Sequence, residues 1–280
     1  NRGVHLFGAN YNMNQLDPKY FSMGLKLQDQ VANPYYGQIT SGALSGKTVT
    51  QGQLLNPFPD YLSIYTLSSH GASSTYHAFQ LTVERRYSNG LSALVSYNNS
   101  KLINDASSSN AGSSSNPDYR IGRLDRRGER SLDENDIPHR LVVSAVYELP
   151  LGPGKSWLTG GVAAAILGGW QLNAIFTYES GGPLVVRGAN NFTGINRPNL
   201  VGDPNIPEDQ RSAAGWFNTS AFANPPNFTI GNVPRTMPNL RGPAYNNIDM
   251  SVFRNMRLTE RVKLEFRAEA FNTLNTVVLN

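Results

Sequence analysis

The sequence of 280 residues contains no cysteine, and only 16% of its residues are charged. The absence of cysteine excludes disulfide scaffolds, zinc ribbons and thiol catalysis. Average soluble domains have about 25% charged residues, so the low charge argues against a coiled coil or a helix-rich surface. No apolar run reaches the ~18 residues that a membrane-spanning helix requires. The longest run, Val162–Leu167, is far shorter.

Small and polar residues make up much of the chain in place of charged ones, and the sequence includes 26 glycines and 17 prolines. Hydrophobic residues still make up 39% of the chain, which is too many for a fully disordered protein. The formal net charge of +4 is scattered along the sequence. Its one dense basic segment, Arg120–Arg130, also contains Asp125 and Glu129. Because nucleic-acid binding needs a concentrated basic surface, we expect no nucleic-acid partner.

Hydrophobic residues recur with a period of two, which is typical of strands with one apolar and one polar face. In Tyr76–Tyr87, apolar residues dominate the odd positions, and polar residues fill most of the even ones. The following Ser88-Asn89-Gly90 predicts a tight turn, because Asn and Gly tolerate positive φ. The same alternation predicts further strands: Leu91–Asn98, Arg140–Leu149, Trp170–Glu179, Asn247–Arg257, Val262–Thr273 and a shorter one near His5–Tyr11.

Long polar segments alternate with short turns between these strands. The long segments span residues 13–74, 102–137 and 181–246 and fall at the same end of the strands. Loops longer than about 15 residues are uncommon in compact soluble domains. Ser107–Ser115 consists almost entirely of Ser, Asn, Ala and Gly, so we expect it to be mobile. Short helices are expected within Val162–Leu167 and at Glu208–Ala214.

The length of the strands indicates the architecture. A strand of about 11 residues at about 3.3 Å per residue, tilted by about 45°, spans roughly 26 Å. This is close to the apolar band of about 25 Å of an outer-membrane barrel. Aromatic residues near the strand ends resemble interfacial girdles: Tyr87, Tyr97, Tyr147, Trp170 and Tyr178. We therefore expect an all-β fold, an antiparallel up-and-down transmembrane β-barrel segment of about seven strands with short turns at one end and long loops at the other.

Eight stretches of the chain resemble, in the same order, the C-terminal barrel region of Oar-like TonB-dependent outer-membrane receptors. They cover nearly the whole sequence, and no single motif carries the resemblance alone. The stretches are NQLDPKYFSMG (Asn14–Gly24), NPYYG (Asn33–Gly37), YHAFQLTVERRYSNGL (Tyr76–Leu91), DIPHRLVVSAVYELPLGPGK (Asp136–Lys155), LGGWQLNAIFTYESGGP (Leu167–Pro183), WFNTSAF (Trp216–Phe222), GNVPR (Gly231–Arg235) and LTERVKLEFRAEAFNTLN (Leu258–Asn275).

The resemblance implies a barrel of about 22 strands with a plug inside, placed in the bacterial cell outer membrane. Such receptors take up a scarce or large ligand with energy supplied through TonB. We expect residues 1–280 to be part of one TonB-dependent receptor β-barrel domain, with the plug domain and the C-terminal strand absent from them. The implied partners are outer-membrane lipid, an unknown nutrient or macromolecular ligand, and the TonB complex through the missing N-terminal plug.

Charged residues on the polar strand faces are the candidates for ligand contact in the lumen. They are Glu84, Arg86, Arg140, Glu148, Glu179, Arg267 and Glu269. Together with Lys263 and Glu265, they could instead pair across adjacent strands and stiffen the wall, which is the interpretation we favour. Trp216 in the third long loop, like Phe217, Phe222 and Phe228, could stack on sugars or peptides, although packing among the loops is the favoured alternative.

No motif in the sequence indicates catalysis, a cofactor or a metal site. The four histidines lack metal-ligand spacing, and we expect His139 to be a hydrogen-bonded structural residue. Gly154-Lys155-Ser156 lacks the first glycine of a phosphate loop, since position 149 is Leu149. The charged loop Asp118–Asp136 could contact acidic lipopolysaccharide or a ligand, or could be solvated and self-paired. We expect a protein that is not an enzyme.

Two other classes of protein remain open from the sequence alone. In a soluble β-rich glycan-binding or adhesion module, the apolar faces of Leu141 and Phe176 would pack on each other. A glycan hydrolase would need two carboxylates about 5–9.5 Å apart. Glu265 and Glu269 lie on one strand face but roughly 13 Å apart along the strand, so this pair does not favour hydrolysis.

Overall fold

The computed structural model describes residues 1–6, 12–66, 70–105, 127–257, 259 and 261–277. The chain forms two compact units from segments that alternate along the sequence. The strand unit consists of His77–Lys101, Ile137–Gly181 and Pro243–Asn280, and the loop unit consists of Asn1–Tyr76, Leu102–Asp136 and Gly182–Gly242. The segment 107–115, which the sequence predicts to be mobile, lies outside the described residues.

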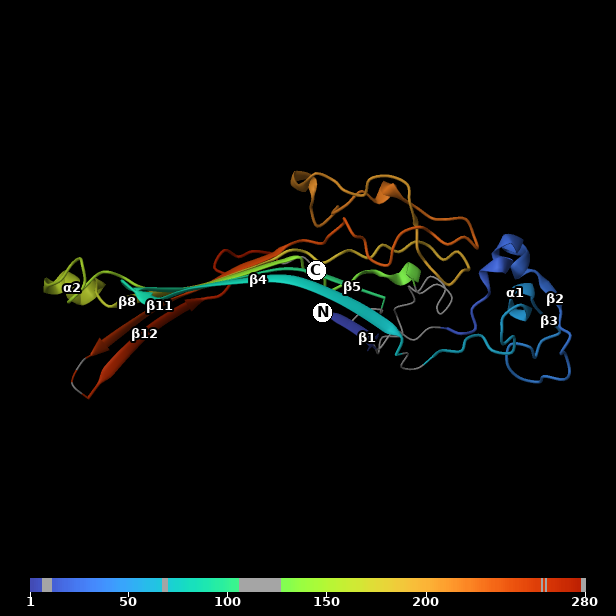
Figure 1. Ribbon diagram of the computed structural model, residues 1–280, viewed down its shortest axis with the longest axis horizontal. Helices are drawn as coiled ribbons and strands as arrows, with labels where there is room; N and C mark the ends of the chain where they lie inside the picture. Colours follow the sequence, from blue (N-terminus) through green and yellow to red (C-terminus); the bar gives the residue numbers. More distant parts are fainter. Residues whose placement is uncertain (7–11, 67–69, 106–126, 258, 260, 278–280) are drawn as a thin grey trace. The chain divides into compact units, whose positions relative to one another are not determined.

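The long strands form one sheet (Figure 1). Their order is β1-β4-β5-β7-β8-β11-β12, and the short β6 pairs with β5. Strands that follow one another in this sheet also follow one another along the chain, so the sheet is an up-and-down meander, as predicted. The bounds are β1 (Arg2–Leu6), β4 (Ala72–Ser88), β5 (Leu91–Asn104), β6 (Ser131–Leu132), β7 (His139–Glu148), β8 (Trp170–Glu179), β11 (Tyr245–Arg257) and β12 (Lys263–Ala270).

Several strand boundaries differ from the prediction; β4 begins four residues earlier and β5 ends six residues later than predicted. The first strand begins at Arg2 and ends at Leu6, because β4 extends back to Ala72 and supplies pairing partners for Arg2 and Gly3; residues 7–11 lie outside the described part of the chain. The last strand stops at Ala270, three residues before the predicted end. Asn272 adopts a positive φ of 47°, which a strand cannot accommodate.

The pairing register keeps the apolar residues of five strands in phase. One row across the sheet consists of Val95, Val143, Phe176 and Ile248. The next row consists of Ala93, Ala145, Ala174, Met250 and Ala270. Since neighbouring residues in a row share a face, β5, β7, β8, β11 and β12 present one continuous apolar face.

The turn between β4 and β5 places the side chains of β4 on the opposite faces of the sheet from those predicted. Asn89 and Gly90 have φ values of 51° and 82°, which define a two-residue type I′ turn, so Ser88 lies opposite Leu91. Consistent with this register, the Tyr87 hydroxyl donates to the Glu148 carboxylate at 2.7 Å. Tyr87 therefore lies on the polar face, and its predicted place in an apolar girdle is wrong.

The long connections all leave the same end of the strands, as predicted. They join β1 to β4, β5 to β7 and β8 to β11, which alternate in an antiparallel meander. The regular elements within the connections are short: η1 (Pro18–Gln28, interrupted at Gly24), β2 (Gln30–Ala32), β3 (Thr48–Thr50), α1 (Gln51–Leu54), η2 (Arg127–Glu129), β9 (Asn199–Leu200), η3 (Glu208–Gln210), η4 (Thr219–Ala221) and β10 (Phe222–Ala223).

The predicted helix at Glu208–Ala214 is only the single turn η3, because Arg211 already has extended backbone angles. The other predicted helix is present as α2 (Gly161–Leu167), in the connection between β7 and β8. In the described part of the chain, no helix is both long enough and apolar enough to span a membrane. A core in the loop unit forms around Val233, Met237 and Leu240.

The connection between β7 and β8 depends on a close approach of two glycines. A Cβ at Gly168 would lie 2.5 Å from the Ala164 carbonyl oxygen and 2.7 Å from the Gly152 Cα. We predict that Gly168→Ala lowers the free energy of unfolding of the full-length protein in urea by about 1–3 kcal/mol. Gly160→Ala is the matched control, since its Cβ would meet nothing within 4 Å. Equal effects of the two substitutions would contradict this packing.

Candidate functional site on the polar face and in the loops

The polar face of the strand unit carries most of the charged residues that the sequence singles out. By register, Arg140, Glu148, Glu179, Arg267 and Glu269 all lie on this face. Arg140 and Glu179 are directly opposite each other on β7 and β8, and their side chains form an ion pair of 2.9 Å. This pair confirms the predicted pairing of opposite charges across adjacent strands.

The other charges pair in different ways. Arg267 contacts Glu265 at 3.2 Å and Glu269 at 3.7 Å, both on its own strand. Glu148 at the end of β7 accepts from the Lys155 ammonium at 2.8 Å and from the Tyr87 hydroxyl. The Glu148 carboxylate also raises the pKa of the Lys155 ammonium, because the hydrogen bond favours the charged form. These charged side chains therefore pair with residues close to them, either on the same strand or at a turn.

Glu84 and Arg86 do not lie with the others. They contact each other at 3.9 Å along β4 and are exposed. Because side chains alternate along a strand and Tyr87 contacts Glu148 on the polar face, both residues point to the opposite face. The prediction that they line the same polar surface is wrong. The turn consists of the two residues Asn89-Gly90 and not of Ser88-Asn89-Gly90, so the pairing of β4 with β5 shifts by one residue and Glu84 and Arg86 move to the other face.

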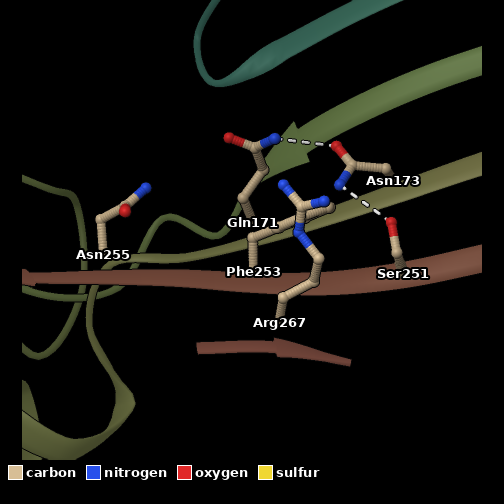
Figure 2. A pocket seen from close by; sticks show the side chains of 6 residues that line it. All are labelled: Gln171, Asn173, Ser251, Phe253, Asn255 and Arg267. Atoms are coloured by element: carbon tan, nitrogen blue, oxygen red, sulfur yellow. Dashed lines mark hydrogen bonds between the residues drawn. The ribbon is translucent and has the colours of Figure 1, made fainter. Parts of the chain in front are cut away.

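An open hollow of about 440 Å³ lies on the polar face of β8, β11 and β12. Figure 2 shows Gln171 donating to Asn173 and Asn173 donating to Ser251, at 2.8 and 3.2 Å. The Arg267 guanidinium lies 4.5 Å from the centre of the Phe253 ring. Its lining residues are Gln171, Asn173, Ser251, Phe253, Asn255 and Arg267. Amide, hydroxyl, guanidinium and aromatic groups together can bind a polar ligand through hydrogen bonds and stacking.

Only Arg267 among these residues was a candidate from the sequence. The alternation places Gln171 and Asn173 on a polar face, but uncharged side chains there do not stand out as candidates for ligand contact. The hollow arises because the small Ser251 lies between longer side chains on adjacent strands. The signal that identifies the hollow is a small side chain paired with larger ones on the adjacent strands. This signal can be recognised only when the pairing register of the strands is known.

In the loop unit, buried ion pairs join the second and third long loops. Glu129 is fully buried, Arg197 is 2% exposed, and their side chains form an ion pair of 2.5 Å. Arg235 donates from Nε to the Glu129 carbonyl at 3.3 Å and also contacts the Asn104 side chain. The sequence leaves open whether the Asp118–Asp136 charges contact a ligand or acidic lipopolysaccharide, or are solvated and self-paired. In the structure, Glu129 is buried against an arginine of another loop.

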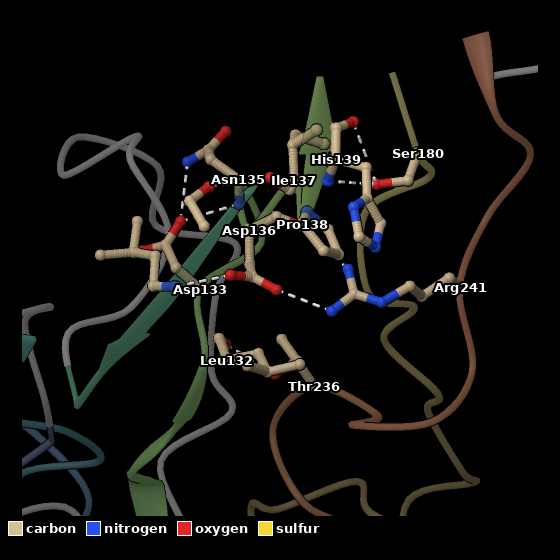
Figure 3. Close-up of polar contacts among 12 residues, drawn as sticks. Leu132, Asp133, Asn135, Asp136, Ile137, Pro138, His139, Ser180, Thr236 and Arg241 are labelled. Carbon is tan, nitrogen blue, oxygen red and sulfur yellow. Dashed lines mark hydrogen bonds and ion pairs between the residues drawn. The ribbon is translucent and has the colours of Figure 1, made fainter. Parts of the chain in front are cut away.

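A second ion pair includes the buried Asp136, which precedes β7 in the sequence. Arg241 binds the Asp136 carboxylate at 2.7 Å and the Asp136 carbonyl at 2.9 Å (Figure 3). Asp136 is 1% exposed and also accepts from the Leu102 backbone N–H at 2.6 Å. Thr236 donates to the Leu132 carbonyl in the same region. These contacts hold the irregular backbone of the two loops together, because the buried Asp136 carboxylate and the buried Thr236 hydroxyl each have a partner.

The loop aromatics pack among themselves, as the favoured interpretation predicted. Phe217 and Phe222 meet edge to face at 5.8 Å, and Phe228 stacks on Phe192 at 5.6 Å. The Trp216 indole donates to the Arg241 carbonyl at 2.6 Å, and the Arg211 guanidinium lies 5.8 Å from its ring centre. The structure therefore uses Trp216 to hold the loop rather than leaving its ring open.

Within the described residues, histidine and acidic side chains form no candidate metal centre. His139 is hydrogen-bonded to the Tyr97 hydroxyl at 2.8 Å and its ring stacks on Tyr97, which confirms its structural role. Across the described ranges, no group of three or more His, Asp or Glu side chains is placed to hold a metal ion.

We predict that Glu129→Gln loosens the loop unit, because removing one partner of a buried ion pair costs about 3–5 kcal/mol. The measurement is the rate of trypsin cleavage within residues 182–242 of the full-length protein, and we expect an increase of about tenfold or more. Glu265→Gln is the control, since that carboxylate is 49% exposed. Unchanged cleavage in Glu129→Gln would show that the buried pair does not hold the loops.

The comparison with known proteins gives one match. A family model described as outer membrane beta barrel domain matches residues 1–280, the whole chain. No curated protein and no solved structure matches the chain.

The family agrees with the geometry of the strand unit, an antiparallel meander with one apolar and one polar face. In such barrels the apolar face meets lipid and the polar face lines the interior. The protein is thus located in the bacterial outer membrane, which does not favour the soluble module considered above. The chain belongs to the family of outer membrane beta barrel domains.

Proposed function

We propose that this chain forms part of the wall and the outer loops of a TonB-dependent outer-membrane transporter that takes up a polar ligand and has no enzymatic activity. The observation that carries the proposal is the open hollow around Asn173, Ser251 and Arg267 on the interior face. The resemblance of eight ordered stretches to Oar-like receptors supports the energised mechanism. In this proposal the TonB complex acts through a plug domain outside these residues.

The loops provide a second line of support. Capture of a ligand from outside requires loops that keep a defined shape, and irregular loops achieve this only when their buried polar groups are paired. The Glu129–Arg197 and Asp136–Arg241 pairs supply such fixed points in the loop unit. A barrel that served only as a membrane anchor would not need this arrangement.

The direct test of energised transport is binding to TonB. The full-length protein, purified in detergent, is titrated with the periplasmic C-terminal domain of TonB from the same bacterium. We expect saturable binding, whereas a porin from the same membrane shows none. Failure of the full-length protein to bind TonB would reject TonB-dependent transport while leaving the barrel and its membrane location intact.

Two adjacent valines on β7 test which face of the sheet meets lipid and which faces the interior. Val143 lies in the apolar row with Val95 and Phe176, whereas Val142 lies on the polar face beside Ser96 and Thr177. Val143→Arg should destabilise the assembled barrel by up to about 2–4 kcal/mol, because a cation then faces lipid. Val142→Arg faces water and should have little effect. The yield of heat-modifiable barrel in outer membranes distinguishes them, and equal yields would contradict the assigned faces.

A further inference from the structure

The connection between β7 and β8 exposes an unusual amount of apolar surface. No charged residue occurs between Ser156 and Trp170. Trp157, Val162 and Ile166 are 65%, 76% and 58% exposed. Within α2 only Ala164 is buried. Large apolar side chains exposed together within one short segment mark a contact with another apolar phase.

Hydrogen bonds attach α2 to the lipid-facing side of the wall. The Trp170 indole donates to the Ile166 carbonyl at 3.1 Å, and the Arg254 guanidinium donates to the Ala165 carbonyl. Trp170 and Arg254 are directly opposite each other on β8 and β11. Both occupy the apolar face, on which Phe266 packs edge to face against Trp170 at 5.6 Å. Figure 1 shows α2 beside the ends of β8 and β11.

Arg254 supplies a cation in this arrangement, and its position fits the edge of the lipid. Its guanidinium lies 5.5 Å from the centre of the Trp170 ring and binds a carbonyl of the last turn of α2. Trp170 and Phe266 lie at the turn end of the apolar face, where aromatic side chains sit at the headgroup level. A cation there can reach the phosphate groups while its stem stays on apolar surface.

We propose that the segment from Trp157 to Leu167, which we name the interfacial foot, lies in the headgroup and upper acyl region of the periplasmic leaflet of the outer membrane. Phospholipid is the occupant of its apolar surface, because the foot continues the lipid-facing surface past the aromatic row of Trp170 and Phe266. The leaflet is periplasmic, since the foot is at the end with short turns. The foot anchors the barrel end in the lipid and does not span the membrane.

Spin labelling tests the foot directly. A nitroxide is placed at Val162→Cys in the full-length protein, reconstituted in phospholipid vesicles; residues 1–280 contain no cysteine. Collision rates with oxygen, which partitions into lipid, and with a water-soluble nickel chelate are then compared. We expect an oxygen-to-nickel ratio several-fold higher than that of a label at Ser156→Cys, an exposed polar position in the same connection.

Every outcome of this experiment decides the proposal. Equal, water-like ratios at positions 162 and 156 would overturn it, because the foot would then be solvated. Low collision rates with both reagents at 162 would also overturn it, because protein rather than lipid would cover the helix. If Val162→Cys does not assemble, Ile166→Cys replaces it, since Ile166 lies one turn later on the same side of α2.

Discussion

The phase of the side-chain alternation is the constraint on which the rest of the structure depends. Each strand alone offers an apolar and a polar face, but a continuous lipid-facing surface forms only if all registers agree. Across β5, β7, β8, β11 and β12 they do, so that rows such as Ala145, Ala174 and Met250 join without a polar interruption. The interior face, the hollow and the attachment of α2 to residues of the apolar face all follow from this agreement.

The long loops depend on a different interaction, the pairing of buried polar groups by side chains. Their backbone is irregular, so buried polar groups cannot be paired by a sheet ladder and must find side-chain partners. Arginines supply these partners because one guanidinium can bind a carboxylate and a backbone carbonyl together, as Arg241 does at Asp136. The loops gain a defined shape from a few buried pairs together with the apolar core around Val233, Met237 and Leu240.

The long strands and the up-and-down order could be predicted because a period of two over ten residues is a local signal. The face of β4 could not, since it depends on whether Asn89-Gly90 forms a two-residue or a longer turn. The buried pair of Glu129 and Arg197 joins residues 68 positions apart, and nothing in the local sequence links them. Apart from Glu84 and Arg86, the charged candidates were correctly placed on the polar face, but small and amide side chains such as Ser251 shape the hollow.

The most direct test of the account is a cysteine scan of β8 in the assembled full-length protein, read out with a small water-soluble thiol reagent. The account predicts labelling at the interior positions 171, 173, 175 and 177 and protection at the lipid-facing positions 172, 174 and 176. Ile175 is the most informative site, because it is apolar yet lies on the interior face beside Ser144 and Asp249. Equal labelling of both series, or protection of the odd positions alone, would contradict the assignment of the two faces.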